Sequence, residues 1–276
     1  MKIALKYFFN LTSLMILSII VRLIGINLYG DDTIEYEWLT LLKNLNNYGI
    51  ISLEGSIPSV FMPPLYLFVL YALQIVTPEN FQLVKVVLIF QVFLSIITIF
   101  VFYNLNKFFF TKNWSLFNSF LLSVFPLNVY TVTQISSISL QIFLLTIYLY
   151  LFFSLQKKPK IINFSVISFS IVSGALMLLR GEFYLIFLIS LIYMFFFKKI
   201  NIKKFLFIFL ISVFVISPYL IRNYIVFDKI VMTKSLGFNL WKGNNPFATV
   251  EGALSGKAHD YDKIFEEIKK IKKNEK

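Results

Sequence analysis

The stretch Val84–Tyr103, VKVVLIFQVFLSIITIFVFY, decides the fold class of this chain. It carries one charge, Lys85, at its start. Its length suits a helix that crosses a bilayer, which needs about 20 mostly apolar residues. A soluble helix would keep a polar face, so we predict an all-α polytopic membrane protein. Similar runs recur at Tyr7–Leu28, Leu116–Tyr130, Ile138–Leu155, Ile161–Leu179, Phe183–Phe197 and Phe205–Ile221.

The composition agrees with a membrane protein and excludes several kinds of chemistry. The chain is 58% hydrophobic and 14% charged, whereas soluble domains average about 25% charged residues. It has no cysteine and one histidine, His259, which excludes disulfides, a thiolate nucleophile and a multi-His metal site. No Gly-rich phosphate loop or Ser-His-Asp set is present. We therefore expect no cofactor and no metal site.

The formal net charge of +12 is explained by topology rather than by nucleic acid. The positive-inside rule places basic connections on the cytoplasmic side with the N-terminus. This holds only if the short apolar run Leu65–Val76 does not cross, which makes it a re-entrant or juxtamembrane helix. If it crosses, every later basic connection faces outward. The basic residues between the runs are Lys107, Lys112, Lys157, Lys158, Lys160, Lys198, Lys199, Lys203 and Lys204.

The predicted organisation is therefore about seven transmembrane helices in the cell (inner or plasma) membrane, plus outer-face amphipathic and juxtamembrane helices. Residues 1–255 form the transmembrane domain, with an outer loop at 30–64. Residues 256–276 form a charged helical tail. Arg22 lies inside the first run, where an arginine marks either an interior pairing or a snorkelled end.

Carboxylates gather in the outer loop and the helix after it. Five of the fourteen acidic residues lie between Gly30 and Tyr71. The apolar spacing predicts an amphipathic surface helix over Asp32–Leu45. Asp32, with Glu35, could act as general base towards an incoming hydroxyl. The alternative is a capping box, in which Asp32 caps the helix and Glu35 reaches back. A divalent cation held by neighbouring Asp31 and Asp32 is conceivable but unsupported.

Cationic and aromatic side chains share the predicted outer face. Lys85, Arg180 and Arg222 could stabilise a phosphate leaving group, or Lys85 and Arg222 could only snorkel to the interface. Trp241 is either a stacking platform for a sugar or an interface anchor. The residues that we expect to contact substrate are Asp31, Tyr36, Lys85, Arg180, Glu182, Arg222, Trp241 and Asn244.

Four blocks in order give the chain a resemblance to a known superfamily. They are Asp32–Tyr36 with Leu42–Leu45 and Pro63–Tyr66; Phe125–Tyr130; Leu179–Glu182; and Pro218–Tyr224 with Leu240–Pro246. The set resembles the GT-C superfamily of membrane glycosyltransferases that use polyprenyl-phosphate sugars. The likeness is to the bacterial branch related to protein O-mannosyltransferases and the aminoarabinose lipid A transferase.

The resemblance implies an inverting transfer from an undecaprenyl- or dolichyl-phosphate sugar to a glycan, lipid or protein acceptor on the outer face. Asp32 matches the family's loop aspartate, the general base. The family often has a second acid after the Phe-Pro block, where this chain reads Gln134–Ser139, and Gly181 stands where the family commonly has proline. The family also continues with further spans, so the chain corresponds to its N-terminal part.

Two alternatives belong to other classes. A non-catalytic membrane subunit would keep the fold without the activity. A lipid or glycolipid transporter would place polar groups at mid-membrane on broken helices. The predicted polar residues gather at one face instead, which favours the enzyme.

Overall fold

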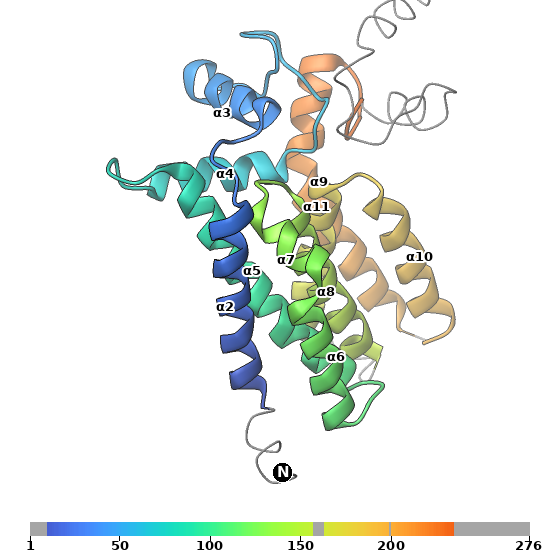
Figure 1. Cartoon of the computed structure of the whole chain (residues 1–276). Coiled ribbons are helices and arrows are strands. Elements are labelled where there is room, and N and C mark those ends of the chain that lie inside the picture. Colours follow the sequence, from blue (N-terminus) through green and yellow to red (C-terminus); the bar gives the residue numbers. More distant parts are fainter. Residues whose placement is uncertain (1–9, 157–162, 199, 235–276) are drawn as a thin grey trace, which may run out of the picture. The chain divides into compact units, whose positions relative to one another are not determined.

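The computed structural model describes residues 10–156, 163–198 and 200–234, and within them the chain is helical (Figure 1). These ranges contain no β-strand, and only one isolated β-bridge joins Glu54 to Ile57. They belong to the compact unit Met1–Thr233, apart from Lys234. The predicted tail 256–276, Trp241 and Asn244 lie outside the described residues. The helices are α2 (Leu11–Tyr29), α3 (Tyr36–Tyr48), α4 (Leu65–Val76), α5 (Leu83–Asn106), α6 (Lys112–Val124), α7 (Pro126–Thr133), α8 (Ile138–Gln156), α9 (Phe164–Leu179), α10 (Phe183–Phe196) and α11 (Ile202–Phe227).

Four described helices are long and apolar enough to cross a membrane: α2, α5, α8 and α11. The bent pair α6–α7 makes a fifth if it is one span. The prediction of an all-helical, multi-pass membrane protein is confirmed at this level. The count of seven is not confirmed, because α9 and α10 have only 16 and 14 residues.

Two prolines in predicted spans have opposite effects. Leu116–Tyr130 was predicted as one segment, but the chain bends by 49° between α6 and α7. Phe125 is extended there (φ −63°, ψ 119°), as the residue before a proline prefers. In α11 the helix continues through Pro218. Pro218 has no N–H to donate to the Phe214 carbonyl. The Ser217 hydroxyl donates to that carbonyl instead (2.8 Å).

Polar side chains satisfy the carbonyl groups that the α6–α7 bend leaves free. The Asn128 amide donates to the Leu122 carbonyl, and Arg22 NH1 donates to the Ser123 carbonyl, both at 3.0 Å. Arg22 Nε also donates to Ser95 Oγ of α5 (2.7 Å). Arg22 is 0% exposed, so the structure places it in an interior pairing rather than at a snorkelled end.

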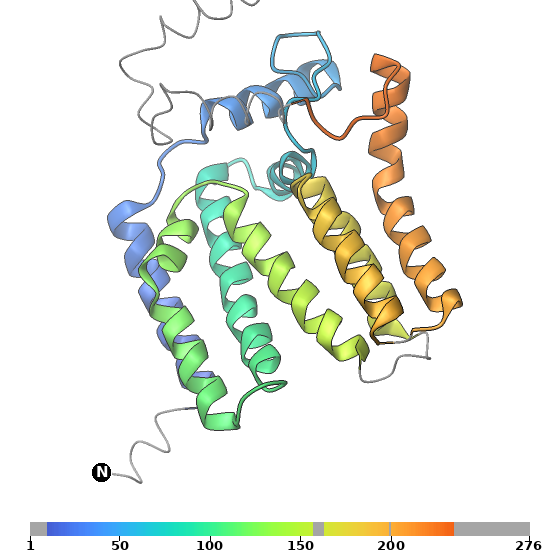
Figure 2. The same ribbon diagram turned by 90° about the vertical axis from the view of Figure 1, so that its right-hand side faces the viewer.

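Helices α3 and α4 lie across one end of the long helices (Figures 1 and 2). α3 buries Trp38, Leu41 and Leu42 and is amphipathic as predicted. It begins at Tyr36, however, so the predicted start at Asp32 is wrong. α4 has 12 residues and is not among the helices long enough to cross. That it does not cross the membrane stays a prediction.

The connections at the opposite end are basic (Figure 2). α5 ends and α6 begins there, next to Lys107 and Lys112. α10 ends and α11 begins at the same end, next to Lys198 and Lys203. Lys203 and Lys204 were predicted in the connection, but both lie in the first turn of α11, where Lys203 is exposed and Lys204 is fully buried.

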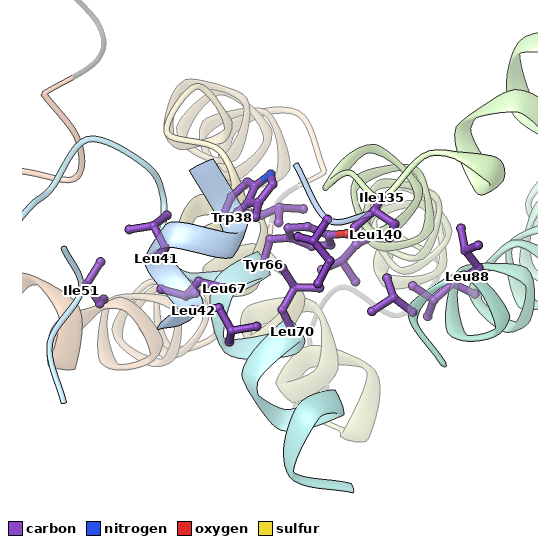
Figure 3. Close-up of a cluster of buried hydrophobic side chains, with 14 of the residues drawn as sticks. Trp38, Leu41, Leu42, Ile51, Tyr66, Leu67, Leu70, Leu88, Ile135 and Leu140 are labelled. Carbon is purple, nitrogen blue, oxygen red and sulfur yellow. The ribbon is translucent and has the colours of Figure 1, made fainter. Parts of the chain in front are cut away.

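Two hydrophobic cores hold the described helices together. The first core joins α3, α4, the start of α5, the α7–α8 connection and the ends of α9 and α11 (Figure 3). Its buried members are Ile34, Trp38, Leu41, Leu42, Ile51, Val60, Tyr66, Leu67, Leu70, Val87, Leu88, Leu94, Ile135, Leu140, Leu179 and Tyr219. The second core joins α8, α9, α10 and α11, and Phe169, Leu191, Met194 and Ile208 are among its members.

Candidate functional site

Asp31 is the most firmly held residue of the acidic loop, which is the segment of residues 30–35 between α2 and α3. Its backbone N–H donates to the Thr133 carbonyl (2.9 Å), and its Oδ2 accepts the N–H of Ile135 (2.6 Å). The loop that follows α2 is therefore bonded to the connection between α7 and α8. One carboxylate oxygen of Asp31 serves this attachment, so the structure gives this predicted substrate-binding residue an anchoring role.

Asp32 has no such attachment. Its side chain is exposed, and no hydrogen bond or ion pair joins its carboxylate to another described residue. The N-cap of α3 is Glu35, which makes no side-chain capping bond. The capping-box alternative is therefore wrong, because the helix begins too late for Asp32 to cap it. Asp32 remains available for chemistry, beside an anchored neighbour.

Glu35 and Tyr36 lie at the start of α3, and both are exposed. Tyr36 is 80% exposed, so its ring is free to contact a partner molecule. The carboxylate of Glu35 acts electrostatically on the buried phenol of Tyr66. Both predicted residues therefore stay at the candidate site.

Tyr66 brings a buried hydroxyl close to these carboxylates, and the sequence analysis did not name it as a site residue. Its ring contacts Trp38 edge-on, with the centroids 4.9 Å apart. The hydroxyl points towards Ile135 and Leu140 (Figure 3) and has no hydrogen-bond partner among the described residues. Burial raises the pKa of this phenol, and the carboxylates of Asp31 and Glu35 raise it further. Tyr66 therefore stays protonated and can donate a hydrogen bond.

Arg222 joins α11 to the segment 51–59. NH1 donates to the Ser59 carbonyl (3.0 Å) and NH2 to the Ile51 carbonyl (3.3 Å). NH1 also donates to Asn223 Oδ1 (2.8 Å), and the guanidinium lies over the ring of Phe227 at 5.3 Å. Its position at the predicted site is thus fixed by loop carbonyls.

The other predicted cations are less engaged. Arg180 NH1 lies 3.9 Å from Glu182 Oε1, but this local pair is largely solvent-exposed, and exposed pairs stabilise little. Lys85 is exposed in the first turn of α5, and no hydrogen bond or ion pair joins its side chain to another described residue. Both cations are free to meet an anionic ligand.

The first core relates these polar residues to one another. Asp32 precedes the core residue Ile34, Lys85 precedes Val87, and Arg180 follows Leu179. Arg222 lies about one helical turn beyond Tyr219, another member. These acidic and cationic residues therefore lie next to members of one core in the sequence, but no hydrogen bond or ion pair joins Asp32, Lys85, Arg180 and Arg222 to one another in the described ranges. No group of three or more His, Cys, Asp or Glu residues suited to a metal occurs in the described ranges.

Gln91 is a second residue that the sequence analysis did not single out. It is 2% exposed in α5 and donates to two carbonyls of the α7–α8 region, those of Val132 (3.1 Å) and Gln134 (2.9 Å). A lone amide within the run Val84–Tyr103 was the available signal, because polar groups in a span are costly and usually have a role.

No family model, no curated protein and no solved structure matches the chain.

Proposed function

We propose that this protein is a membrane glycosyltransferase that moves a sugar from a polyprenyl-phosphate carrier to a lipid, glycan or protein acceptor. The site would face outward from the cell membrane, with α9 and α10 completing seven spans. The observation that carries the proposal is the contrast between Asp31 and Asp32. The first is bonded to the α7–α8 connection, and the second has a free carboxylate beside it.

A carboxylate with no structural partner, on a fixed stretch of backbone, suits a general base. It can accept a proton from a substrate without first breaking a bond within the protein. Placing it beside the anchored Asp31 limits the positions that it samples, which favours a productive geometry. Lys85 and Arg180, whose side chains reach solvent beside the first core, offer hydrogen-bond donors to a sugar phosphate.

The proposed step is a single displacement. Asp32 takes the proton of the acceptor hydroxyl while the acceptor oxygen bonds to the anomeric carbon from the face opposite the phosphate. The bond from the anomeric carbon to the phosphate oxygen breaks, and its electron pair stays on the lipid phosphate. Charge on the departing phosphate is stabilised by Arg180, Arg222 and Lys85. The configuration at the anomeric carbon is inverted, since no covalent intermediate forms.

The test uses the full chain in lipid nanodiscs with radiolabelled polyprenyl-phosphate hexoses and pentoses and envelope acceptors. Asp32→Asn should lower the transfer rate about 10²–10⁴-fold, the usual range for a lost general base. Glu37→Gln is the matched control, because Glu37 is another exposed acid in the first turn of α3. Sugar transfer by Asp32→Asn at the wild-type rate would contradict the role of Asp32 as general base. No transfer by any form favours the non-catalytic subunit or the transporter.

A second candidate, a lipid or glycolipid transporter, draws support from a separate observation. α6 and α7 form a bent pair, and the buried Arg22 bonds to the carbonyl at the bend. Arg22 Nη2 is buried, and no residue in the described ranges bonds to it. Broken helices and an arginine inside a span recur in transport pathways.

The transporter is tested with vesicles that contain a fluorescent polyprenyl phosphate in both leaflets. Addition of a membrane-impermeant quencher should remove all fluorescence quickly if the protein moves the lipid, and only half if it does not. Arg22→Met should slow complete quenching, and Arg180→Met should not. Half quenching with the wild-type protein counts against transport of this lipid.

A further inference from the structure

The amide of Gln91 is the centre of a hydrogen-bond chain that ends at the acidic loop. Its Nε2 donates to the carbonyls of Val132 and Gln134. These groups lie where α7 ends and the connection to α8 begins. Helix ends leave their last carbonyls without partners in the helix. A buried carbonyl without a hydrogen-bond partner is destabilising, so the Gln91 amide stabilises this connection.

The same connection holds Asp31 from its other side. The Thr133 carbonyl accepts the N–H of Asp31, and the Ile135 N–H donates to the Asp31 carboxylate. Gln91 thus bonds to residues 132 and 134, and Asp31 bonds to residues 133 and 135. The short segment 132–135, made of the end of α7 and the residues after it, is therefore bonded both to the buried amide and to Asp31.

A further bond ties the segment to α2. Gln134 Nε2 donates to the Tyr29 carbonyl (3.1 Å), one residue before the Gly30 that ends α2. Tyr29 and Asp31 are thus both attached to the segment. A shift of the connection would move the acidic loop with it.

We propose that Gln91 is a positioning residue: through segment 132–135 it fixes Asp31, and with it the adjacent Asp32. The effect on catalysis rests on the proposed glycosyltransferase function, but the geometric part does not. Gln91 does not touch substrate in this proposal. It lies inside α5 and acts through four backbone groups.

A purely structural role for Gln91 has a different consequence. If the amide only provides hydrogen bonds to the carbonyl groups at the end of α7, its loss lowers the stability of the protein without altering the surroundings of Asp31. If it positions the loop, its loss exposes the Asp31 carboxylate. The two roles are therefore separated by a measurement on Asp31 itself.

The first experiment labels carboxylates on the full chain in nanodiscs with a water-soluble carbodiimide and an amine. Fragmentation mass spectrometry distinguishes Asp31 from Asp32. Asp32 should react several times faster than Asp31 in the wild type, because a hydrogen bond and partial burial protect Asp31. Gln91→Met keeps the volume of the side chain and removes the donor. We expect it to raise Asp31 labelling at least about threefold, as local opening becomes easier.

Thr98→Val is the matched control, because Thr98 is buried on the same helix and donates only to the Leu94 carbonyl of α5. It should leave Asp31 labelling unchanged. Gln134→Ala loosens the segment from its other attachment and should raise labelling by a smaller factor. Gln91→Leu removes the same donor and serves as the second variant should Gln91→Met fail to fold. Asp31 labelling at the wild-type level in a folded Gln91 variant overturns the proposal.

The second experiment measures sugar transfer in a double-mutant cycle of Gln91→Met and Asp31→Ala. Each change alone should lower kcat about tenfold with little effect on KM, since a loosened base is misplaced rather than lost. The double variant should be no slower than the slower single variant, because both changes release the same loop. Multiplicative losses contradict the chain of bonds. If the wild type transfers no sugar, the labelling result still decides whether Gln91 positions Asp31.

Discussion

The two halves of the described chain are held together by different means. Around α2, α5, α6 and α7, buried polar side chains bond to interrupted backbone: Arg22 to Ser123, Asn128 to Leu122, and Gln91 to Val132 and Gln134. Around α8, α9, α10 and α11, aromatic and aliphatic side chains form the second core. The hydrogen bonds of the first group fix the orientation of the backbone segments that they join, whereas the apolar side chains of the second group fill the interior between helices. The acidic loop is attached to the first group.

Small residues allow the close packing of the second half. A Cβ added at Gly174 of α9 would lie 2.6 Å from Val215 Cβ of α11. The Ser212 hydroxyl donates across the same contact to the Ser170 carbonyl (3.0 Å). Small and hydroxylated residues commonly let membrane helices approach closely. We therefore expect α9, whose C-cap is Arg180, and α11, which contains Arg222, to be held rigidly together in this half.

The largest effect on stability should come from emptying the second core. Phe169→Ala removes a fully buried ring, which costs about 3–5 kcal/mol in a close-packed interior. Thermal unfolding in nanodiscs should show it. Phe164→Ala, at an 82% exposed position of the same helix, is the control and should change little. Asp31 labelling should stay as in the wild type at temperatures where Phe169→Ala is folded. Increased labelling would show that the two halves are coupled.

A matched serine pair tests the polar half next. Ser95→Ala removes the acceptor of Arg22 Nε and should cost about 1.5–3 kcal/mol, as for hydrogen bonds to charged groups. Ser173→Ala in α9 removes only a bond to the Phe169 carbonyl of the same helix, so it should cost about 0.5 kcal/mol or less. Unfolding free energies of the two variants give the comparison. Equal losses of unfolding free energy would mean that the hydrogen bond between Arg22 and Ser95 stabilises the protein no more than the bond within α9 does.

The third effect is local. Arg222→Met removes the donors to the Ser59 and Ile51 carbonyls and should lower the local stability of residues 51–60 by about 1–2 kcal/mol. Hydrogen exchange should therefore become faster in that segment and remain unchanged in α9. Arg180→Met is the control, because Arg180 makes only a local pair with Glu182. Unchanged hydrogen exchange in Arg222→Met would show that residues 51–60 keep their structure without the bonds from Arg222.

The smallest effect is expected at Tyr66. Tyr66→Phe removes a buried hydroxyl that has no partner, so stability should change by no more than about 0.5 kcal/mol or rise slightly. Transfer activity should stay near the wild-type rate, because the hydroxyl is buried and points towards Ile135 and Leu140. Trp38→Phe, which alters the edge-on ring contact, should lower stability more than Tyr66→Phe does. A large stability loss in Tyr66→Phe would reveal a structural bond for the hydroxyl.

Periodicity and length were sufficient for much of the fold. Leu65–Val76 was predicted with the bounds that α4 has, and Ile138–Leu155 ends one residue before α8 does. The errors lie where local chemistry competes with apolar length. Leu116–Tyr130 reads as one run, but Pro126 bends it. Asp32–Leu45 reads as a capped helix, but α3 starts only at Tyr36, after the chain has been bonded to residues 133 and 135.

The amino-acid sequence by itself determined that this is a multi-pass helical membrane protein with its carboxylates concentrated in one loop, because apolar length and charge placement are local properties. Only the tertiary structure decided which carboxylate is anchored and which is free. Asp31 and Asp32 are identical side chains in adjacent positions, and the difference arises from contact with a segment about a hundred residues away. Gln91 likewise gains its role only from the carbonyls that the fold places beside it.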